Sequence, residues 1–320
     1  MTPSRSYEKV PYPIRPSKQV ERKLFLEILH KLGKEGLPVQ DYTYIGMGSI
    51  FYVDFILFHR YLYVESMICA EHSDDKKRMR FNKPYKFIRL ENGDVASLIP
   101  EVEEGKRYLV WLDYDTPLDG DKLNHFGGFL RRLASGSVIM ITVDAQRRID
   151  EDELQSGTTL KDLDDQACKE LNLPFKRYLG RPVVRADLSY NGLPSMLSRV
   201  LRAKSEEIMA LRGSMRLLQL FNYRYADGAQ MYTYGGLVCD QALGDRLASS
   251  TILEVVGVAR GLEPISISVP PLTMREKEWL DSKIRSRIRI DKMPFELKQS
   301  ALDAYLEFYK HYPSFRDALL

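Results

Sequence analysis

Residues 43–54 read TYIGMGSIFYVD, and this stretch decides the fold. Two glycines, Gly46 and Gly48, stand between a short β-rich run and a long apolar run. Glycine lets a backbone turn tightly and approach a ligand closely, and a helix that follows offers free N–H groups at its start. Such a unit is either a plain turn or a cofactor loop. The dinucleotide pattern G-x-G-x-x-G needs a third glycine where this chain has Phe51, which disfavours a dinucleotide.

The chain around this unit alternates predicted strands with predicted helices. Continuous apolar runs predict buried parallel strands, at 42–46, 67–71, 85–90, 108–113 and 137–144. Helices are predicted between them, at 17–32, 50–62, within DDKKRMRFN, weakly at 95–100, and at 121–134. Ser17 is the expected N-cap of the first helix and Gly33 its end. This alternation predicts an α/β, doubly wound, Rossmann-like sheet.

The second half of the chain changes this rhythm. Residues 145–192 are polar and predict an insertion that could act as a lid, and a helix is predicted at 193–212. Two Tyr-rich runs then flank Asp227-Gly228, which predicts an antiparallel β-hairpin. Five strand–helix steps closed by such a hairpin are the layout of class I S-adenosylmethionine-dependent methyltransferases.

Three regions follow from these patterns. Residues 1–40 form an N-terminal arm and helix, 41–250 the methyltransferase-like domain with its insertion, and 251–320 a helical extension. Within the extension, Thr273-x-x-Glu276 is a capping box that predicts the start of a helix.

Polar residues after the predicted strands are candidates for holding the cofactor. Glu71 ends the second predicted strand, about 20 residues beyond the glycine loop, the spacing at which a carboxylate binds ribose hydroxyls, and His72 follows it. Asp94 lies in an Asn-Gly-Asp turn after the third strand, near where an adenine amino group would lie. In the loop, Met47 and Ser49 join the two glycines as expected cofactor contacts. Each acid is alternatively a solvated surface residue.

Residues at the end of the fourth strand are the candidates for catalysis. Asp113 and Asp115 stand two residues apart in WLDYDTPLD, and His125 follows downstream. Methyl transfer needs alignment of the acceptor with the methyl group and removal of a proton from an oxygen or nitrogen. Two close carboxylates can differ in pKa, which leaves one as a general base. His125 is a second candidate base, or a helix residue with no role in the chemistry.

Four segments together resemble a known family. YPIRPSKQVERKL, DYTYIGMGSIFYVDFILFHR, RMRFNKPY and VWLDYDTPLD, within roughly residues 12–145, are similar to bacterial O-methyltransferases of the Methyltransf_35 type. The resemblance implies a class I methyltransferase fold with S-adenosylmethionine as cofactor, and it implies no substrate. Gly46, Gly48, Glu71 and Asp113 then fall on general methyltransferase positions. Tyr44 departs from the usual acid before the loop, and Ile50 from a common third glycine.

Three cations of the first predicted helix can share one face. Arg15, Lys18 and Arg22 are spaced i, i+3 and i+7. Such a face could hold an anionic group of the acceptor or close over the cofactor, or it could be an ordinary solvated helix face.

Composition limits the partners. Lys and Arg number 47 against 44 Asp and Glu, so a net charge of +3 leaves a nucleic-acid partner open without indicating one. Three dispersed cysteines predict no metal site and a reducing cytoplasm. The polar N-terminus is not that of a signal peptide, and no membrane span is expected. The Tyr-rich hairpin could support a homodimer or a multi-protein complex.

Two alternative functions stay open at the level of sequence. One is a methyltransferase-like sensor or scaffold without catalysis, in a bacterial multi-gene system such as phage defence. The other, weaker alternative is an NAD-linked oxidoreductase. The acceptor of the methyl group is not defined by the sequence.

Overall fold

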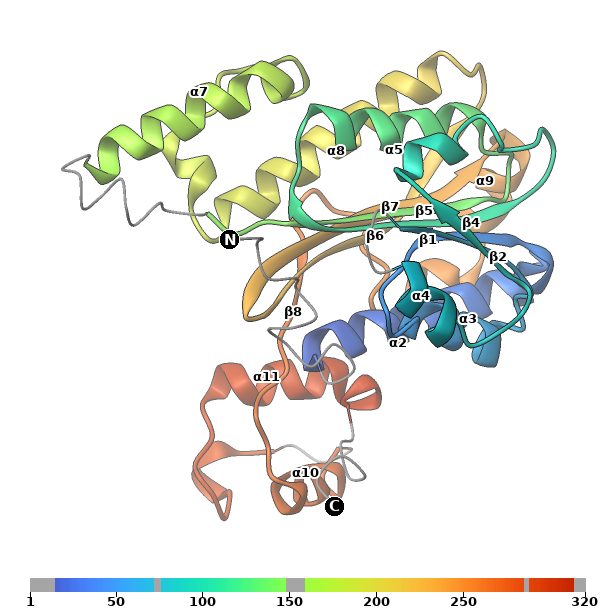
Figure 1. The fold of residues 1–320 in the computed structure, drawn as a ribbon. Helices are drawn as coiled ribbons and strands as arrows, with labels where there is room; N and C mark the ends of the chain where they lie inside the picture. The colour runs from blue at the N-terminus through green and yellow to red at the C-terminus, as the bar shows by residue number, and fades with distance from the viewer. Residues whose placement is uncertain (1–14, 72–75, 148–158, 285–287, 314–320) are drawn as a thin grey trace.

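A single mixed β-sheet organises the protein. The computed structural model describes residues 15–71, 76–147, 159–284 and 288–313. Within these ranges eight strands lie in the order β3-β2-β1-β4-β5-β7-β6-β8 (Figure 1). The strands are β1 (Thr43–Met47), β2 (Ser66–Glu71), β3 (Ile88–Asn92), β4 (Tyr108–Pro117), β5 (Val138–Asp144), β6 (Arg216–Asp227), β7 (Ala229–Cys239) and β8 (Ile265–Ile267).

The pairing directions confirm the predicted fold class. Strands β1 to β5 pair in parallel, whereas β7 runs antiparallel to both β5 and β6. The hairpin turns at Gly228, whose φ of 102° is readily adopted by glycine. The hairpin therefore enters the sheet with its second strand against β5, which returns β6 to the direction of the parallel strands.

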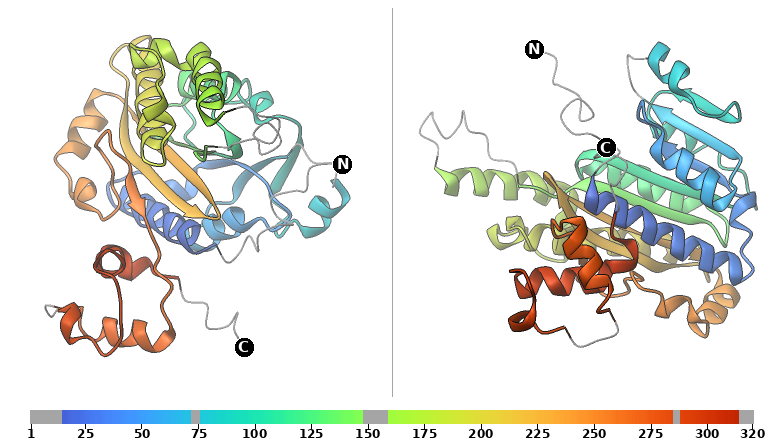
Figure 2. Two further views of the ribbon diagram at one scale, coloured as in Figure 1. Left: turned by 90° about the vertical axis from the view of Figure 1, so that its left-hand side faces the viewer. Right: turned by 90° about the horizontal axis from the view of Figure 1, so that it is seen from below.

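Helices cover both faces of the sheet. Helices α2 (Pro16–Lys34), α3 (Val53–Leu62) and α4 (Lys76–Asn82) lie on one face. Helices α5 (Gly120–Arg132) and α8 (Gly192–Ala210) lie on the other, as Figures 1 and 2 show. The two faces have separate hydrophobic cores because side chains alternate along each strand. On β4, Trp111 packs toward α2 and Leu112 toward α5.

The first helix is anchored by the tip of the hairpin. Helix α2 begins at Pro16 with Arg15 at the N-cap, so the expectation that Ser17 is the cap was wrong. Instead, Asp227 accepts hydrogen bonds from the backbone N–H groups of Ser17 (3.0 Å) and Lys18 (2.9 Å). A carboxylate from a strand 209 residues away thus satisfies the free amides at the start of the helix.

Several predicted boundaries needed correction. Helix α3 starts at Val53, not at residue 50, because Tyr52 adopts a left-handed φ of 49°. Helix α2 continues to Lys34, past the predicted end at Gly33. The polar stretch 145–192 contains a long helix, α7 (Leu160–Leu179), which packs on α8; residues 148–158 lie outside the described ranges.

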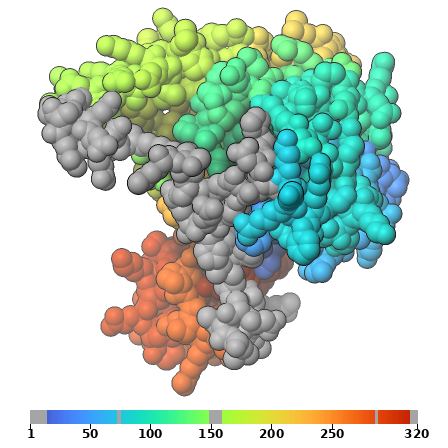
Figure 3. All heavy atoms as spheres, viewed as in Figure 1, coloured from blue at the N-terminus to red at the C-terminus, as the bar shows by residue number. Residues whose placement is uncertain are grey.

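The C-terminal extension has a small core of its own and touches α2. Helices α10 (Met274–Asp281) and α11 (Gln299–Phe308) bury Leu280, Leu302 and Tyr305 together, and the capping box at Thr273 is confirmed. Figure 3 shows this region as a lobe beneath the rest of the molecule. The lobe meets α2 where His311 Nε2 lies 2.7 Å from the Glu27 carboxylate.

Other elements complete the chain. Helix α9 (Gln241–Ala248) follows β7, and four residues after Ser250 form a short 3-10 turn. Strand β8, which the sequence did not predict, pairs in parallel with β6. Among the described residues, no helix combines the length and apolar character needed to cross a membrane.

Candidate active site

The glycine loop lies at the carboxyl end of β1, as its sequence predicts. Gly48 continues the pairing of β1 by donating from its N–H to the Ala70 carbonyl at 3.0 Å. The chain then turns through Ser49, whose carbonyl accepts from the Tyr52 N–H at 3.1 Å. Helix α3 begins at Val53, so the loop connects the end of β1 to the N-terminus of α3.

Both glycines are required by neighbouring side chains. A Cβ at Gly46 would lie 2.2 Å from the Tyr44 hydroxyl oxygen, and one at Gly48 would lie 2.3 Å from the sulfur of Cys69. Contacts this close do not occur, so a larger residue at either position would displace its neighbour. Packing against the side chains of Tyr44 and Cys69 therefore requires glycine at both positions.

Tyr44 replaces the usual acid for a structural reason. Its ring is buried on the α2 face, with centroids 4.8 Å from both Phe55 and Phe58 of α3. Burial raises the pKa of Tyr44 well above its usual value, and the nearby carboxylates of Asp54 and Asp113 raise it further. The phenol is therefore neutral and acts as a core residue beside two acids.

A small cavity marks the meeting point of the loop and β4. Its volume is about 30 Å³, and Asp54 and Asp113 contribute carboxylates to its lining. The remaining lining residues are Met47, Gly48, Ser49, Tyr52, Val53 and Phe55. This volume suits one water-sized group, so the cavity can receive a single reacting group.

Asp113 is held by a lysine from the first helix. Lys18 Nζ lies 2.9 Å from Asp113 Oδ1 and 3.0 Å from Glu21 Oε2, and its side chain is almost fully buried. The ammonium also lies 4.4 Å above the Trp111 ring. Two carboxylates and an aromatic face thus surround the Lys18 side chain. One oxygen of Asp113 is thus committed to this ion pair.

The ion pair continues into a buried chain of hydrogen bonds. The Thr233 hydroxyl donates to Glu21, and it pairs with the Thr142 hydroxyl at 2.8 Å. Thr142 in turn accepts from Trp111 Nε1 at 3.0 Å. Glu21 is fully buried, and desolvation is the largest influence on its pKa, which is raised despite the ammonium of Lys18. The network fixes the position of α2 against β4, β5 and β7.

A second buried ion pair closes the other side of the cavity. Arg22 Nε lies 2.5 Å from Asp54 Oδ1, and Arg22 Nη2 lies 3.4 Å from Asp54 Oδ2. Lys18 and Arg22 therefore share a face, as their spacing predicts, and that face points into the protein toward the sheet. Arg15 lies at the start of the same helix and is partly buried.

The remaining candidates for cofactor binding flank the loop. Glu71 ends β2, and its Oε2 lies 3.6 Å from the position a Cβ of Gly48 would take, so its carboxylate adjoins the loop. Burial raises the pKa of Tyr52, and the neighbouring Glu71 carboxylate adds to this. His72 lies outside the described residues.

Asp94 and His125 lie together on the opposite face of β4 from Asp113. The Asp94 side chain accepts from the Ala96 N–H at 2.8 Å, and its Oδ1 lies 3.6 Å from His125 Nδ1. The same ring nitrogen lies 2.9 Å from the hydroxyl of Tyr114. Since Tyr114 and Asp113 are adjacent in a strand, their side chains point to opposite faces. The three predicted catalytic residues therefore do not lie together. Asp113 lines the cavity, whereas His125 lies next to Asp94. Asp115 is exposed, beyond the buried part of β4.

Sequence reasoning missed Asp54 and Glu21. Asp54 is the one acid within the apolar run of α3, and this isolation was a signal for burial with a partner. Glu21 follows Lys18 by three residues, which is the spacing of a helical ion pair.

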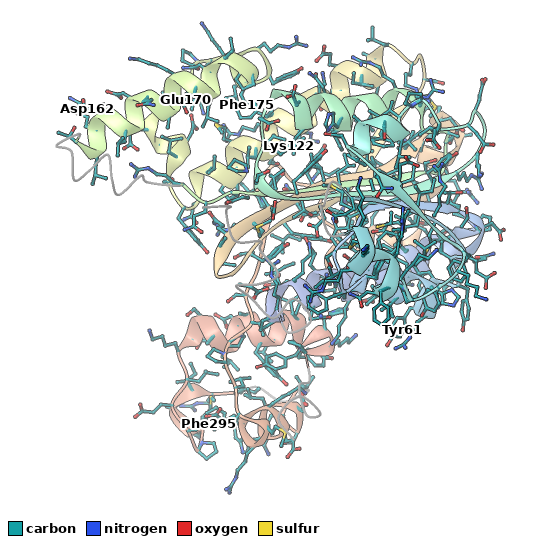
Figure 4. All side chains as sticks on the ribbon, viewed as in Figure 1. Tyr61, Lys122, Asp162, Glu170, Phe175 and Phe295 are labelled. Carbon is teal, nitrogen blue, oxygen red and sulfur yellow. The ribbon has the colours of Figure 1, made fainter. Side chains whose placement is uncertain are left out.

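Figure 4 labels Lys122 on α5, across the sheet from α2; its ammonium lies 5.6 Å from the Tyr114 ring.

Strand order, loop and carboxylates together define a class of protein. A sheet ordered 3-2-1-4-5-7-6 with an antiparallel seventh strand, and a glycine loop after its first strand, is that of a class I methyltransferase. The model of the Methyltransf_35 family, described as "Putative O-methyltransferase", matches residues 10–320. The chain belongs to this family, which confirms the resemblance seen in its sequence.

Similarity to solved structures is distant. The N-methyltransferase NodS from Bradyrhizobium japonicum is 10% identical over 68% of this chain and 97% of its own, with a TM-score of 0.33. A S-adenosylmethionine-dependent methyltransferase from Clostridium acetobutylicum is 14% identical over 43% of this chain and 55% of its own, with a TM-score of 0.31.

LepI in its complex with SAM is a third similar structure. It is 9% identical, with a TM-score of 0.31, and the match covers 62% of this chain but only 43% of LepI. A search of curated proteins finds no significant match. The fold assignment rests on the strand order described above.

Proposed function

We propose that the protein transfers the methyl group of S-adenosylmethionine to an oxygen or nitrogen acceptor, with Asp113 beside the acceptor. The observation that carries the proposal is the meeting of the glycine loop with the Asp113 carboxylate in one small cavity at the carboxyl edge of the sheet. Ligands of open α/β sheets bind at this edge. The description of the family favours oxygen as the acceptor atom.

The residues at this edge fit the cofactor. The loop between β1 and α3 would offer backbone N–H groups to a carboxylate, and Glu71 beside Gly48 would offer acceptors for two ribose hydroxyls. Asp94 lies one strand further, where it could accept from an amino group of the base. S-adenosylmethionine supplies a methyl group activated by a positive sulfur. The carboxylates of Asp54 and Asp113, each paired with a cation of α2, would lie near that end.

Asp113 would orient the acceptor and receive its proton through the oxygen that Lys18 leaves open. Lys18 holds the other oxygen at 2.9 Å, so the carboxylate keeps a fixed direction. A fixed acceptor reduces the entropy lost in aligning the reacting atoms. Because the ammonium of Lys18 holds one oxygen in place, alignment of the acceptor is the main contribution of Asp113.

Calorimetric titration with S-adenosylmethionine tests the cofactor. Binding is expected for the unaltered protein and at least about tenfold weaker binding for Glu71→Ala, since the ribose would lose charge-assisted hydrogen bonds. Asp245→Ala, an exposed acid of α9, is the matched control and should bind normally. No binding by the unaltered protein, or equal binding by Glu71→Ala, rejects the proposed site.

Transfer of labelled methyl from S-adenosylmethionine into fractionated cell extract tests the reaction. Label is expected in one fraction among protein, nucleic acid and small molecules. Asp113→Asn should lower the rate while leaving cofactor binding intact, and Asp115→Asn, two residues along the same strand, is its control. Equal rates for both variants would remove Asp113 from the reaction.

A protein that binds the cofactor without turnover is the second candidate. The ion pair between Lys18 and Asp113 favours it, because one oxygen of this carboxylate is already engaged by a buried ammonium. This candidate predicts binding in the titration together with no labelled product from any extract.

A further inference from the structure

A second cavity lies at the opposite edge of the sheet. Its volume is about 410 Å³, within the range of pockets for small organic molecules. The start of β6, the second half of α8, and α9 form its walls. Because β6 runs in the direction of the parallel strands, its start lies at the edge away from the glycine loop. The cavity is therefore separate from the proposed methyl-transfer site.

Three arginines from three parts of the chain line this cavity. Arg202 comes from α8, Arg216 from β6, and Arg260 from the segment after α9. Glu206 is the one acid in the lining, 3.4 Å from Arg202 Nε. The lining thus carries three positive charges against one negative charge. Arg260 is exposed and forms no ion pair with the residues that the structure describes.

Gln219 brings a buried, unused acceptor to the same cavity. Its Nε2 donates to the carbonyls of Ala259 (2.7 Å) and Gly261 (2.9 Å), which fixes the orientation of the amide and holds the backbone on both sides of Arg260. Its Oε1 is buried and finds no partner within the described part of the chain, and the residue as a whole is 7% exposed. A buried acceptor without a donor is uncommon and calls for a ligand or water.

The guanidinium of Arg216 is also placed for a ligand. It lies flat against Gly244 of α9, where a Cβ would stand 2.2 Å from Nη2 and 2.4 Å from Nε. Nη2 reaches Asp245 at 3.0 Å, and the guanidinium also lies beside the thiol of Cys239. Because Gly244 has no side chain, the Arg216 guanidinium can lie in the wall of the cavity.

We propose that this cavity binds a phosphorylated small molecule of about the size of a nucleoside monophosphate. Guanidinium groups bind phosphate oxygens in pairs, and the three arginines leave an excess of positive charge even with Glu206 beside Arg202 and Asp245 beside Arg216. Leu217, Leu253 and Tyr234 offer apolar surface to the body of the molecule. Gln219 Oε1 would accept from an N–H or O–H group on that body.

Calorimetric titration of the full chain with AMP tests this site, with adenosine and inorganic phosphate as partial probes. AMP is expected to bind at least about tenfold more tightly than either, because only AMP offers both the anion and the apolar body. Arg260→Ala should weaken the binding of AMP at least about tenfold. Since Arg260 is exposed, this variant should fold normally, and an unchanged melting temperature verifies it.

Two control variants separate this site from the proposed cofactor site. Arg89→Ala removes an exposed arginine of β3, and Glu71→Ala alters the edge with the glycine loop. Both should bind AMP within about twofold of the unaltered protein. The proposal is overturned by absence of AMP binding, by phosphate alone binding as tightly, by normal binding in Arg260→Ala, or by weakened binding in either control.

Discussion

The ammonium of Lys18 lies 2.9 Å from the carboxylate of Asp113 and joins the first helix to the end of the central strand β4. The two residues are 95 positions apart in the sequence. Because the contact is buried, it holds α2 over the carboxyl edge of the sheet and sets which oxygen of Asp113 faces the cavity.

Lys18→Met is expected to destabilise the fold strongly. The substitution keeps the length of the side chain but leaves Asp113 and Glu21 without their cation. Loss of one partner from a buried ion pair typically costs roughly 3–5 kcal/mol. Urea unfolding measures the change. Lys34→Met, at an exposed position of the same helix, should stay within about 0.5 kcal/mol of the unaltered protein, and an equal loss in both variants would contradict the role of the ion pair.

Glu21 should make stability fall as pH rises. Burial raises its pKa in the folded state above the 4.5 of the free side chain, so the folded protein holds this proton more tightly than the unfolded chain. The resulting stabilisation is complete below about pH 4.5 and is lost as pH rises through the raised pKa. Glu21→Gln lacks this dependence. Urea titration from about pH 4.5 to 8 measures the unfolding free energy of both proteins. As pH rises over this range, the unaltered protein should lose stability relative to Glu21→Gln. A difference that is flat with pH would refute the assignment.

Gly48→Ala should disturb the loop through Cys69. The added Cβ would stand 2.3 Å from the buried sulfur, and overpacking of this kind costs roughly 1–3 kcal/mol. The double variant Gly48→Ala with Cys69→Ala should recover part of that loss, because the smaller residue makes room. Gly33→Ala is the control, since it meets no atom within 4 Å in a helix and should be neutral or stabilising. Thermal unfolding compares the three variants, and a double variant no more stable than Gly48→Ala would count against the clash.

Asp227→Ala should weaken the start of α2. Its carboxylate accepts from two backbone amides of the first turn, and loss of an N-terminal cap costs about 1 kcal/mol. The expected result is a lower urea midpoint with an unchanged slope. Asp115→Ala, an exposed acid of β4, provides the comparison and should leave the midpoint unchanged.

Local sequence patterns were sufficient for the first seven strands of the sheet. The apolar runs of β4 and β5 are continuous because both faces are covered, and Asp227-Gly228 placed the hairpin correctly. They were insufficient for α2, where Lys18, Glu21 and Arg22 look like solvated charges in the sequence. Their partners lie 32 to 212 residues away, apart from the Lys18–Glu21 pair, so no local pattern could reveal that this charged face is buried. Strand β8 was missed because three residues between loops carry no periodic signal.

The lobe formed by α10 and α11 touches the same helix that carries Lys18. Lys23 Nζ donates to the carbonyls of His311 and Tyr312 at 3.2 and 3.3 Å, and His311 meets Glu27. One helix thus faces the reaction edge on one side and the C-terminal lobe on the other. A molecule that binds the lobe could therefore alter methyl transfer by shifting α2, without entering the glycine-loop site.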